Sequence, residues 1–205
     1  MNSTALAVLR ESEIEEMVFI DHGGDYPYTY DYVKYMIKQG FPITVVKPDV
    51  EGFDNLPDFC ESKRVFPNRL FRWCTDKFKI RTLRKYYKSS LPIRLYVGFC
   101  AGEEKRVKTE FRFSKGIYAS YPLIQMGVDR EGCVDVIEEA GLKVPCRSCC
   151  WFCFNANREE LKRLRQDYPD LWLRRKDMRE ADLRRWAETK YIPLTKFIDN
   201  KGETR

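Results

Sequence analysis

Short apolar runs alternate with amphipathic segments along most of the chain. Three runs are apolar at nearly every position, 17–21, 43–47 and 93–99, and a fourth short extended stretch covers 116–123. Unbroken apolar runs of this length are typical of strands that are buried on both faces, as in parallel sheets. The hydrophobic pattern therefore predicts strands at these positions.

Helical periodicity fills the spaces between these runs. Helices are expected over 2–16, 28–40, 73–89, 129–140, 157–166 and 176–190. Prolines and glycines predict loops over 48–70 and 100–106, and a polar tail follows the last helix. Such alternation predicts an α/β fold, with a mostly parallel sheet, helices on both faces, and ligands beyond the carboxyl ends of the strands.

Composition places few limits on function. Of the 205 residues, 43% are hydrophobic, which is enough for the core of one domain. The net charge of +6 permits an anionic partner such as a nucleotide or a nucleic acid without requiring one. The first ten residues lack the features of a secretion signal, and no apolar run is long enough to span a membrane. We therefore expect a cytoplasmic protein with no membrane partner.

Half of the eight cysteines lie in one segment, PCRSCCWFCFN, at Cys146, Cys149, Cys150 and Cys153. In a reducing compartment such a cluster is typical of a metal or redox site rather than of disulfides. Four thiolates are the ligand set of structural zinc and of [4Fe-4S] clusters, and the spacing fits either. Because the side chains of adjacent residues diverge, Cys149 and Cys150 are hard to aim at one metal.

This divergence favours a fourth ligand from elsewhere, and Cys74 is the best candidate. It lies at the predicted start of the basic helix, where the backbone dipole favours a thiolate. Nearby cations would offset the negative charge of a thiolate-bound centre, namely Arg69, Arg72, Lys77 and Lys79. The isolated cysteines Cys60, Cys100 and Cys133 are expected to be buried and structural. The single histidine, His22, is expected to be a turn residue.

Four segments, in the same order, resemble motifs of the PP-loop proteins of the phosphoadenosine phosphosulfate (PAPS) reductase group. NSTALAVL (2–9) is similar to the end of the family's phosphate loop, and FIDHGGDYPYTYDYV (19–33) to its strand-and-turn motif. RWCTDKFKI (72–80) resembles R-x-C-T-x-x-L-K-I, and CRSCCWFC (146–153) resembles the C-x3-C-W-x-C run. That run belongs to the iron–sulfur branch with the sulfurtransferase of DNA phosphorothioation.

The resemblance implies a Rossmann-like domain of the adenine nucleotide alpha-hydrolase type over 1–144, with its first strand absent. A cysteine-rich loop and C-terminal helices over 145–205 would pack on this domain. The implied cofactor is a [4Fe-4S] cluster, with zinc as the alternative, held by Cys74, Cys146, Cys150 and Cys153. Cys149 would not be a ligand.

The resemblance also implies that ATP or another adenine nucleotide binds across the carboxyl ends of the strands. The residues expected to bind it are Asn2, Ser3, Thr4, Asp21, Gly23, Gly98 and Glu103. The catalytic cations Arg72, Lys79 and Arg106 would hold phosphate or sulfate oxygens by charge-assisted hydrogen bonds.

The sequence departs from the family in two places. The family has a lysine where Met1 stands, and the S-G-G half of the loop does not precede it. Without that half, only the helix start at Asn2, Ser3 and Thr4 remains to hold an anion. Either the true start lies upstream, or the chain is a truncated copy that could be inactive. Cys100 replaces an arginine of the family's G-I-R-x-x-E-S-x-R motif.

The resemblance therefore implies an ATP-using sulfurtransferase-like enzyme, with a sulfur-donor protein as partner and nucleic acid as a candidate substrate. One alternative is a non-catalytic, metal-stabilised remnant that binds nucleic acid or a protein through the basic segments 77–88 and 158–185. A second alternative is a sulfonucleotide reductase, which the absence of any cysteine after Cys153 disfavours.

Overall fold

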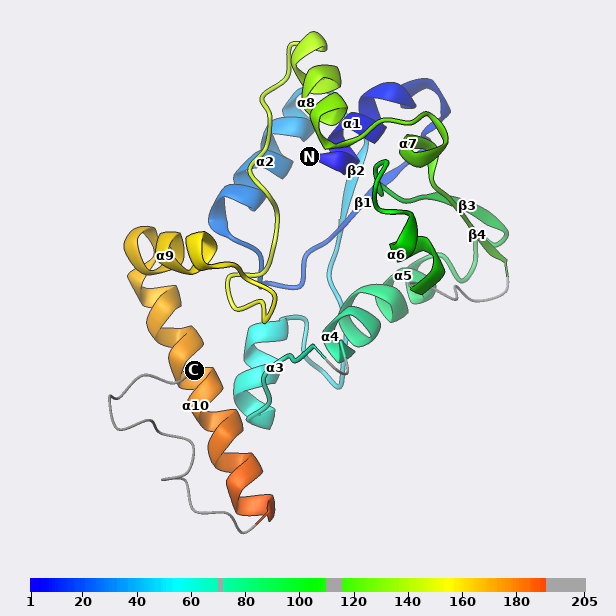
Figure 1. Cartoon of the computed structure of the whole chain (residues 1–205). Helices are drawn as coiled ribbons and strands as arrows, with labels where there is room; N and C mark the ends of the chain where they lie inside the picture. The colour runs from blue at the N-terminus through cyan, green and yellow to red at the C-terminus, as the bar shows by residue number, and fades with distance from the viewer. Residues whose placement is uncertain (70–71, 110–115, 191–205) are drawn as a thin grey trace.

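The computed structural model describes residues 1–69, 72–109 and 116–190, which form a mixture of helices and strands (Figure 1). Strand β1 (Met17–Ile20) pairs in parallel with β2 (Ile43–Val46), and α2 (Pro27–Lys38) connects them. Strand β3 (Ile93–Tyr96) pairs in parallel with β4 (Ile117–Ser120). The four predicted strands and their parallel pairing are confirmed, but the described strands form two separate sheets rather than one.

Helices make up most of the other described elements. The described helices outside the β1–β2 unit are α1 (Asn2–Leu9), α3 (Leu56–Lys63), α4 (Trp73–Thr75), α5 (Arg81–Tyr86), α6 (Glu104–Thr109), α7 (Pro122–Gln125), α8 (Arg130–Glu139), α9 (Arg158–Asp167) and α10 (Pro169–Lys190). A π-helical turn, Asp76–Ile80 (η2), joins α4 to α5, so the predicted basic helix is continuous with an irregular middle. None of the helices in the described ranges combines the length and apolar character that crossing a bilayer requires.

Several predicted element boundaries are wrong. The first helix ends at Leu9 instead of residue 16 and is followed by a 3-10 turn over Glu11–Glu13, because the acidic segment ESEIEE places like charges side by side. A helix, α3, lies inside the predicted loop 48–70. The Asn55 side chain caps it by accepting the Asp58 N–H at 3.1 Å, and Pro57 stands in the first turn, where proline is compatible with a helix.

Two further helices begin at positions that the sequence did not predict, and a proline explains the start of α10. Helix α6 begins inside the loop predicted over 100–106, and α10 begins at Pro169 rather than residue 176. Proline is favoured in the first turn of a helix because its missing N–H would have no partner there. The predicted polar tail, 191–205, lies outside the described residues.

Two hydrophobic cores hold these elements together. The first joins the turn after β1 to α3, η2, α9 and α10, and its buried members are Tyr26, Leu56, Phe59, Cys60, Phe66, Phe78, Trp151, Phe152, Leu164 and Met178. The second lies between α1 and α8, and its buried members are Ala5, Leu6, Cys100, Leu123, Cys133 and Ile137. The isolated cysteines Cys60, Cys100 and Cys133 are therefore core residues, as predicted. The first core contains residues from both sides of the predicted boundary at 144–145.

Candidate functional site

An open cavity of about 660 Å³ lies between the start of α1, strand β1, helix α2 and the cysteine segment. Its polar and reactive lining includes Ser3, Thr4, Asp25, Lys79, Cys146 and Cys149. Its apolar lining comes mainly from β1 and α2, with the aromatic rings of Tyr28, Tyr32 and Tyr35. A mostly apolar hollow with a few convergent polar groups is the usual form of a small-molecule site.

The cysteine segment is fixed in place by its two aromatic residues. Trp151 and Phe152 are buried in the first core, and the Trp151 N–H donates to the Gly24 carbonyl at 3.0 Å. Asp25 and Cys150 pair through an isolated antiparallel bridge. These contacts bring the cysteine segment against the turn that follows β1. In Figure 1 the chain runs down from α8 to this segment, which lies near α3.

Three of the four predicted metal ligands are gathered around Lys79. Cys74, Cys150 and Cys153 all act electrostatically on the Lys79 ammonium, as does Asp25. Each of these thiols is half-buried. Burial raises the pKa of Cys150 well above its ordinary value, and burial likewise raises the pKa of Cys74, while the charge of Lys79 opposes both shifts. The Lys79 ammonium is therefore the nearby cation best placed to stabilise thiolates.

Lys79 itself is held between the thiols and the cavity. Many protein atoms lie near the Lys79 side chain. The side chain is nevertheless exposed, because it forms part of the wall of the open cavity. Burial acts to lower the pKa of Lys79, but Cys150, Asp25 and the other thiols outweigh this effect, so its pKa lies above the ordinary value. A charged ammonium is thus presented to the cavity.

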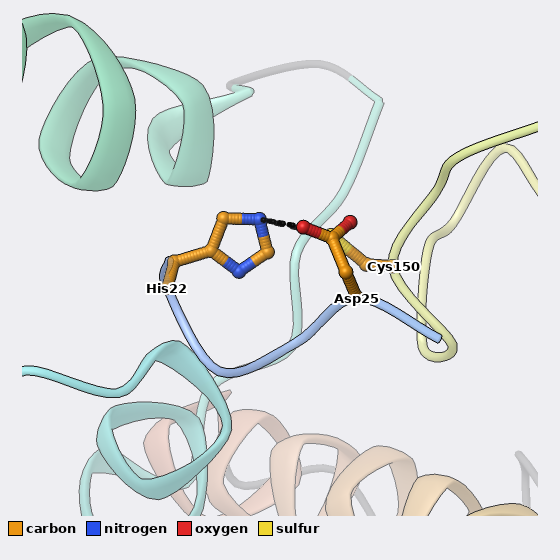
Figure 2. A group of neighbouring side chains, drawn as sticks. All are labelled: His22, Asp25 and Cys150. Atoms are coloured by element: carbon orange, nitrogen blue, oxygen red, sulfur yellow. Dashed lines mark hydrogen bonds and ion pairs between the residues drawn. The ribbon is translucent and has the colours of Figure 1, made fainter. Parts of the chain in front are cut away.

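Figure 2 shows His22, Asp25 and Cys150 converging from two segments of the chain. The potential ligand atoms of these residues lie within 4.8 Å of one another, close enough to hold a metal ion. The His22 Nε2 atom lies 3.5 Å from the Asp25 carboxylate and 3.7 Å from the Cys150 sulfur. The His22 side chain is fully buried, and this burial lowers its pKa, with the Lys79 charge acting in the same direction.

Cys146 and Cys149 are placed differently from the other loop cysteines. Cys146 is exposed and lines the cavity, so the structure does not bring it into the group around Lys79. Cys149 faces Glu160. Burial, and to a smaller extent the Glu160 carboxylate, raises the pKa of Cys149 to about 12. The adjacent Cys149 and Cys150 side chains therefore have different surroundings. Cys153 accepts a hydrogen bond at its sulfur from the Asn155 N–H at 3.4 Å.

Residues predicted to bind the nucleotide meet at the start of α1. The Asn2 side chain donates to Glu103 at 3.1 Å, and Glu103 also accepts the Cys100 N–H at 3.1 Å. A side chain at Gly98 would come within 3.1 Å of the Ser3 nitrogen, so glycine there allows the backbone of α1 to approach the loop after β3. Among this group, Ser3 and Thr4 line the cavity.

The other predicted site residues lie outside the described cavity lining. Asp21 accepts the Gly23 N–H at 3.0 Å and so shapes the turn after β1, where Gly23 has a φ of 71°. Arg106 pairs with Glu103 at 2.6 Å and covers the Phe99 ring. Arg72 is exposed immediately before α4. Of the three predicted catalytic cations, the described structure places only Lys79 on the cavity wall.

Asp25 and His22 were missed as site residues by sequence reasoning. Their pattern, Asp21-His22-Gly23-Gly24-Asp25, carries a local signal, because paired glycines after a buried strand allow close backbone approach. The sequence could not show that the turn meets a segment more than a hundred residues away. That contact depends on the packing of Trp151 and Phe152.

Many cations of the two basic segments are paired with acidic side chains. In the segment 77–88, Lys77 pairs with Glu51, and Lys85 pairs with Asp49. In the segment 158–185, Arg174 pairs with both Asp58 and Glu61. These pairs reduce the positive field that a nucleic acid would meet on either surface.

No known protein family matches the sequence, and no curated protein matches it.

Proposed function

We propose that the protein is an adenine-nucleotide-dependent, sulfurtransferase-like enzyme of the PAPS reductase type, with a Rossmann-like nucleotide domain and a thiolate-bound [4Fe-4S] cluster. One observation carries this proposal. A single cavity is lined both by the start of α1, at Ser3 and Thr4, and by Lys79 and the cysteine segment. Lys79 therefore connects a space suited to phosphate oxygens with the thiols of Cys74, Cys150 and Cys153.

The donor set suits an iron–sulfur cluster. Cys74, Cys150 and Cys153 would hold it, and Cys146, which the structure leaves on the cavity wall outside this group, would have to approach them to be the fourth ligand. One zinc ion holds its sulfur ligands about 3.8 Å apart, given tetrahedral geometry. Among the described residues, no group of three cysteine sulfurs lies within 4.8 Å of one another. A cubane cluster separates its ligand sulfurs more widely, so the proposed cluster does not require a tight group of sulfurs.

The nucleotide would lie along the cavity with its phosphates toward Ser3, Thr4 and Lys79. The positive end of the α1 dipole and the Lys79 ammonium would stabilise negative charge on the phosphoryl oxygens. In the proposed reaction, a substrate oxygen attacks the α-phosphorus and releases pyrophosphate, and the sulfur of a donor then displaces AMP. The cluster would supply a sulfur-binding or redox-active centre beside this site.

The non-catalytic alternative receives less support from the described surface. Its basic segments are partly neutralised by Glu51, Asp49, Asp58 and Glu61. The cavity, by contrast, has an accessible lysine and an open thiol-rich wall, which a binding remnant does not require. The sulfonucleotide reductase alternative would use the same cavity but needs a nucleophilic cysteine from another source.

The test is to purify the full chain without air, measure iron, sulfide and zinc, and titrate ATP by calorimetry. We expect about four irons per chain, a broad absorbance near roughly 400 nm, and saturable ATP binding. Stoichiometric zinc without iron would overturn the cluster. A folded, metal-loaded chain that binds no ATP would overturn the enzyme and favour the non-catalytic module.

A further inference from the structure

The buried imidazole of His22 has a defined hydrogen-bonding role. Its Nδ1 atom accepts the Gly24 backbone N–H at 3.1 Å, and this contact is buried. Because Nδ1 uses its lone pair as an acceptor, it cannot also carry a proton. The neutral ring is therefore the Nε2–H tautomer, and the Nε2 atom faces two acceptors as a donor.

Both acceptors lie near the same ring nitrogen, Nε2. The Asp25 carboxylate is 3.5 Å from Nε2, and the Cys150 sulfur is 3.7 Å from it (Figure 2). A nucleophilic cysteine relay needs the thiol and the carboxylate on opposite ring nitrogens. The geometry therefore excludes a Cys–His–Asp relay in this arrangement.

The same proton placement bears on metal binding. A metal-bound imidazole coordinates through one unprotonated nitrogen and donates its other N–H to an acceptor. Here the second nitrogen, Nδ1, meets a donor, the Gly24 N–H, instead of an acceptor. Coordination through Nε2 would leave the ring without any proton, although His22 lies within ligand distance of Cys150.

We infer that His22 is not a metal ligand but a positioning residue that donates its Nε2–H to the Cys150 sulfur, sharing that proton with Asp25. Glycine at position 24 makes this possible, since a side chain there would meet the Phe152 ring at 2.7 Å and the imidazole at 3.1 Å. The donor places a partial positive charge beside one thiol of the proposed centre. Cys153 receives a comparable donor from the Asn155 N–H.

Hydrogen bonds to the sulfur ligands of an iron–sulfur cluster shift its reduction potential. A donor at Cys150 stabilises the more negative, reduced state and therefore raises the potential. This functional role rests on the proposed function, because it requires a cluster at Cys150. The direction of the hydrogen bond does not rest on the proposed function, because it is a property of the protein alone.

The first test uses the only histidine of the chain. Full-length protein labelled with ¹⁵N-histidine gives one pair of ring nitrogens, and long-range ¹H–¹⁵N spectra show which of them carries the proton. We expect a protonated Nε2 and an unprotonated Nδ1 in the metal-free and zinc-loaded chain alike. A proton on Nδ1, or a metal-bound Nε2, would overturn the inference.

The second test uses the iron-loaded protein. His22→Leu removes the donor, whereas His22→Gln keeps an N–H at the end of the side chain. We expect iron content unchanged in His22→Gln, and a reduction potential that is more negative in His22→Leu than in His22→Gln or wild type. Equal potentials in all three proteins would exclude the donor role. A chain that binds no iron would instead defeat the proposed function, while the NMR result would still decide the tautomer.

Discussion

The backbones of Asp25 and Cys150 pair in an isolated antiparallel bridge, which ties the turn after β1 to the cysteine segment. This pairing brings a carboxylate and a half-buried thiol close to Lys79, which interacts electrostatically with both. The site therefore depends on a contact between two loops. Its stability rests on the buried aromatic side chains beside it, Trp151 and Phe152.

This dependence predicts a strong effect at Gly24. In Gly24→Ala the new methyl carbon would lie 2.7 Å from the Phe152 ring, so the two loops would have to separate. We expect a loss of about 1–3 kcal/mol in the free energy of unfolding, as for other overpacked sites, measured by urea denaturation.

Gly132→Ala is the matched control. In helix α8 the new carbon would make only ordinary contacts, at 3.4 Å to Val128 and 3.5 Å to Asp129. Alanine is the better helix former, so this variant should gain up to about 1 kcal/mol. Equal stability of the two variants would contradict the proposed tightness of the Gly24 contact.

Lys79 should carry much of the nucleotide affinity. Replacing it by methionine keeps the length of the side chain and removes the charge that lines the cavity. A hydrogen bond between charged groups contributes about 1.5–3 kcal/mol, so Lys79→Met should weaken ATP binding roughly ten- to hundredfold. Calorimetric titration measures this change.

Lys77→Met tests whether any lost lysine has the same effect. Lys77 is two residues away but pairs with Glu51 on the outside of the helix. Its substitution should change ATP affinity by less than about twofold, because a screened surface charge contributes little. Comparable losses in both variants would indicate a general electrostatic effect rather than a phosphate contact.

The cysteines should differ in their importance for iron binding. Cys74→Ala and Cys150→Ala each remove a thiol that interacts with Lys79, and both should lose most of the iron and the absorbance near roughly 400 nm. Cys149→Ala should retain both, because Cys149 faces Glu160 instead. Iron assays on anaerobically purified variants measure the outcome. If Cys150→Ala retained a full cluster, the proposed cluster site at Cys150 would be wrong.

Glu103 should make stability depend on pH. Burial opposes ionisation of Glu103, but hydrogen bonds from Arg106 and from the Cys100 N–H outweigh it, so its pKa is lowered. A carboxyl with a lowered folded-state pKa stabilises the protein above its unfolded-state pKa and loses this contribution as the pH falls through the folded-state value. The contribution, at most about 1 kcal/mol at this partly exposed position, should begin to fall near the unfolded-state pKa of roughly 4.3 and vanish once the pH lies below the lowered folded-state pKa.

The measurement compares the melting temperatures of wild type and Glu103→Gln between neutral and acidic pH. The difference should be largest at neutral pH and disappear on acidification, since both side chains are then uncharged. Glu139→Gln, at an exposed position near the end of α8, controls for the general loss of one negative charge. A pH-independent difference for Glu103→Gln would show that its hydrogen bonds do not depend on ionisation.

The sequence by itself determined the strands and most of the helices, because their signals are local. The apolar runs at Met17–Ile20 and Ile43–Val46 predict strands wherever they are placed in the fold, and Asn157 predicts the start of α9 through its capping box. The cysteine spacing likewise pointed to a metal site, and the divergence of Cys149 from Cys150 follows from backbone geometry alone.

Only the tertiary structure decided which residues share the site. It placed Cys74, Cys150 and Cys153 around Lys79, left Cys146 exposed on the cavity wall, and brought His22 and Asp25 to the sulfur of Cys150. It also divided the strands into two sheets. These features depend on contacts between distant segments, whose energies come from burying Trp151 and Phe152 in a core assembled from several helices. Local spacing does not contain that information, because which surfaces meet is set by the packing of the whole chain.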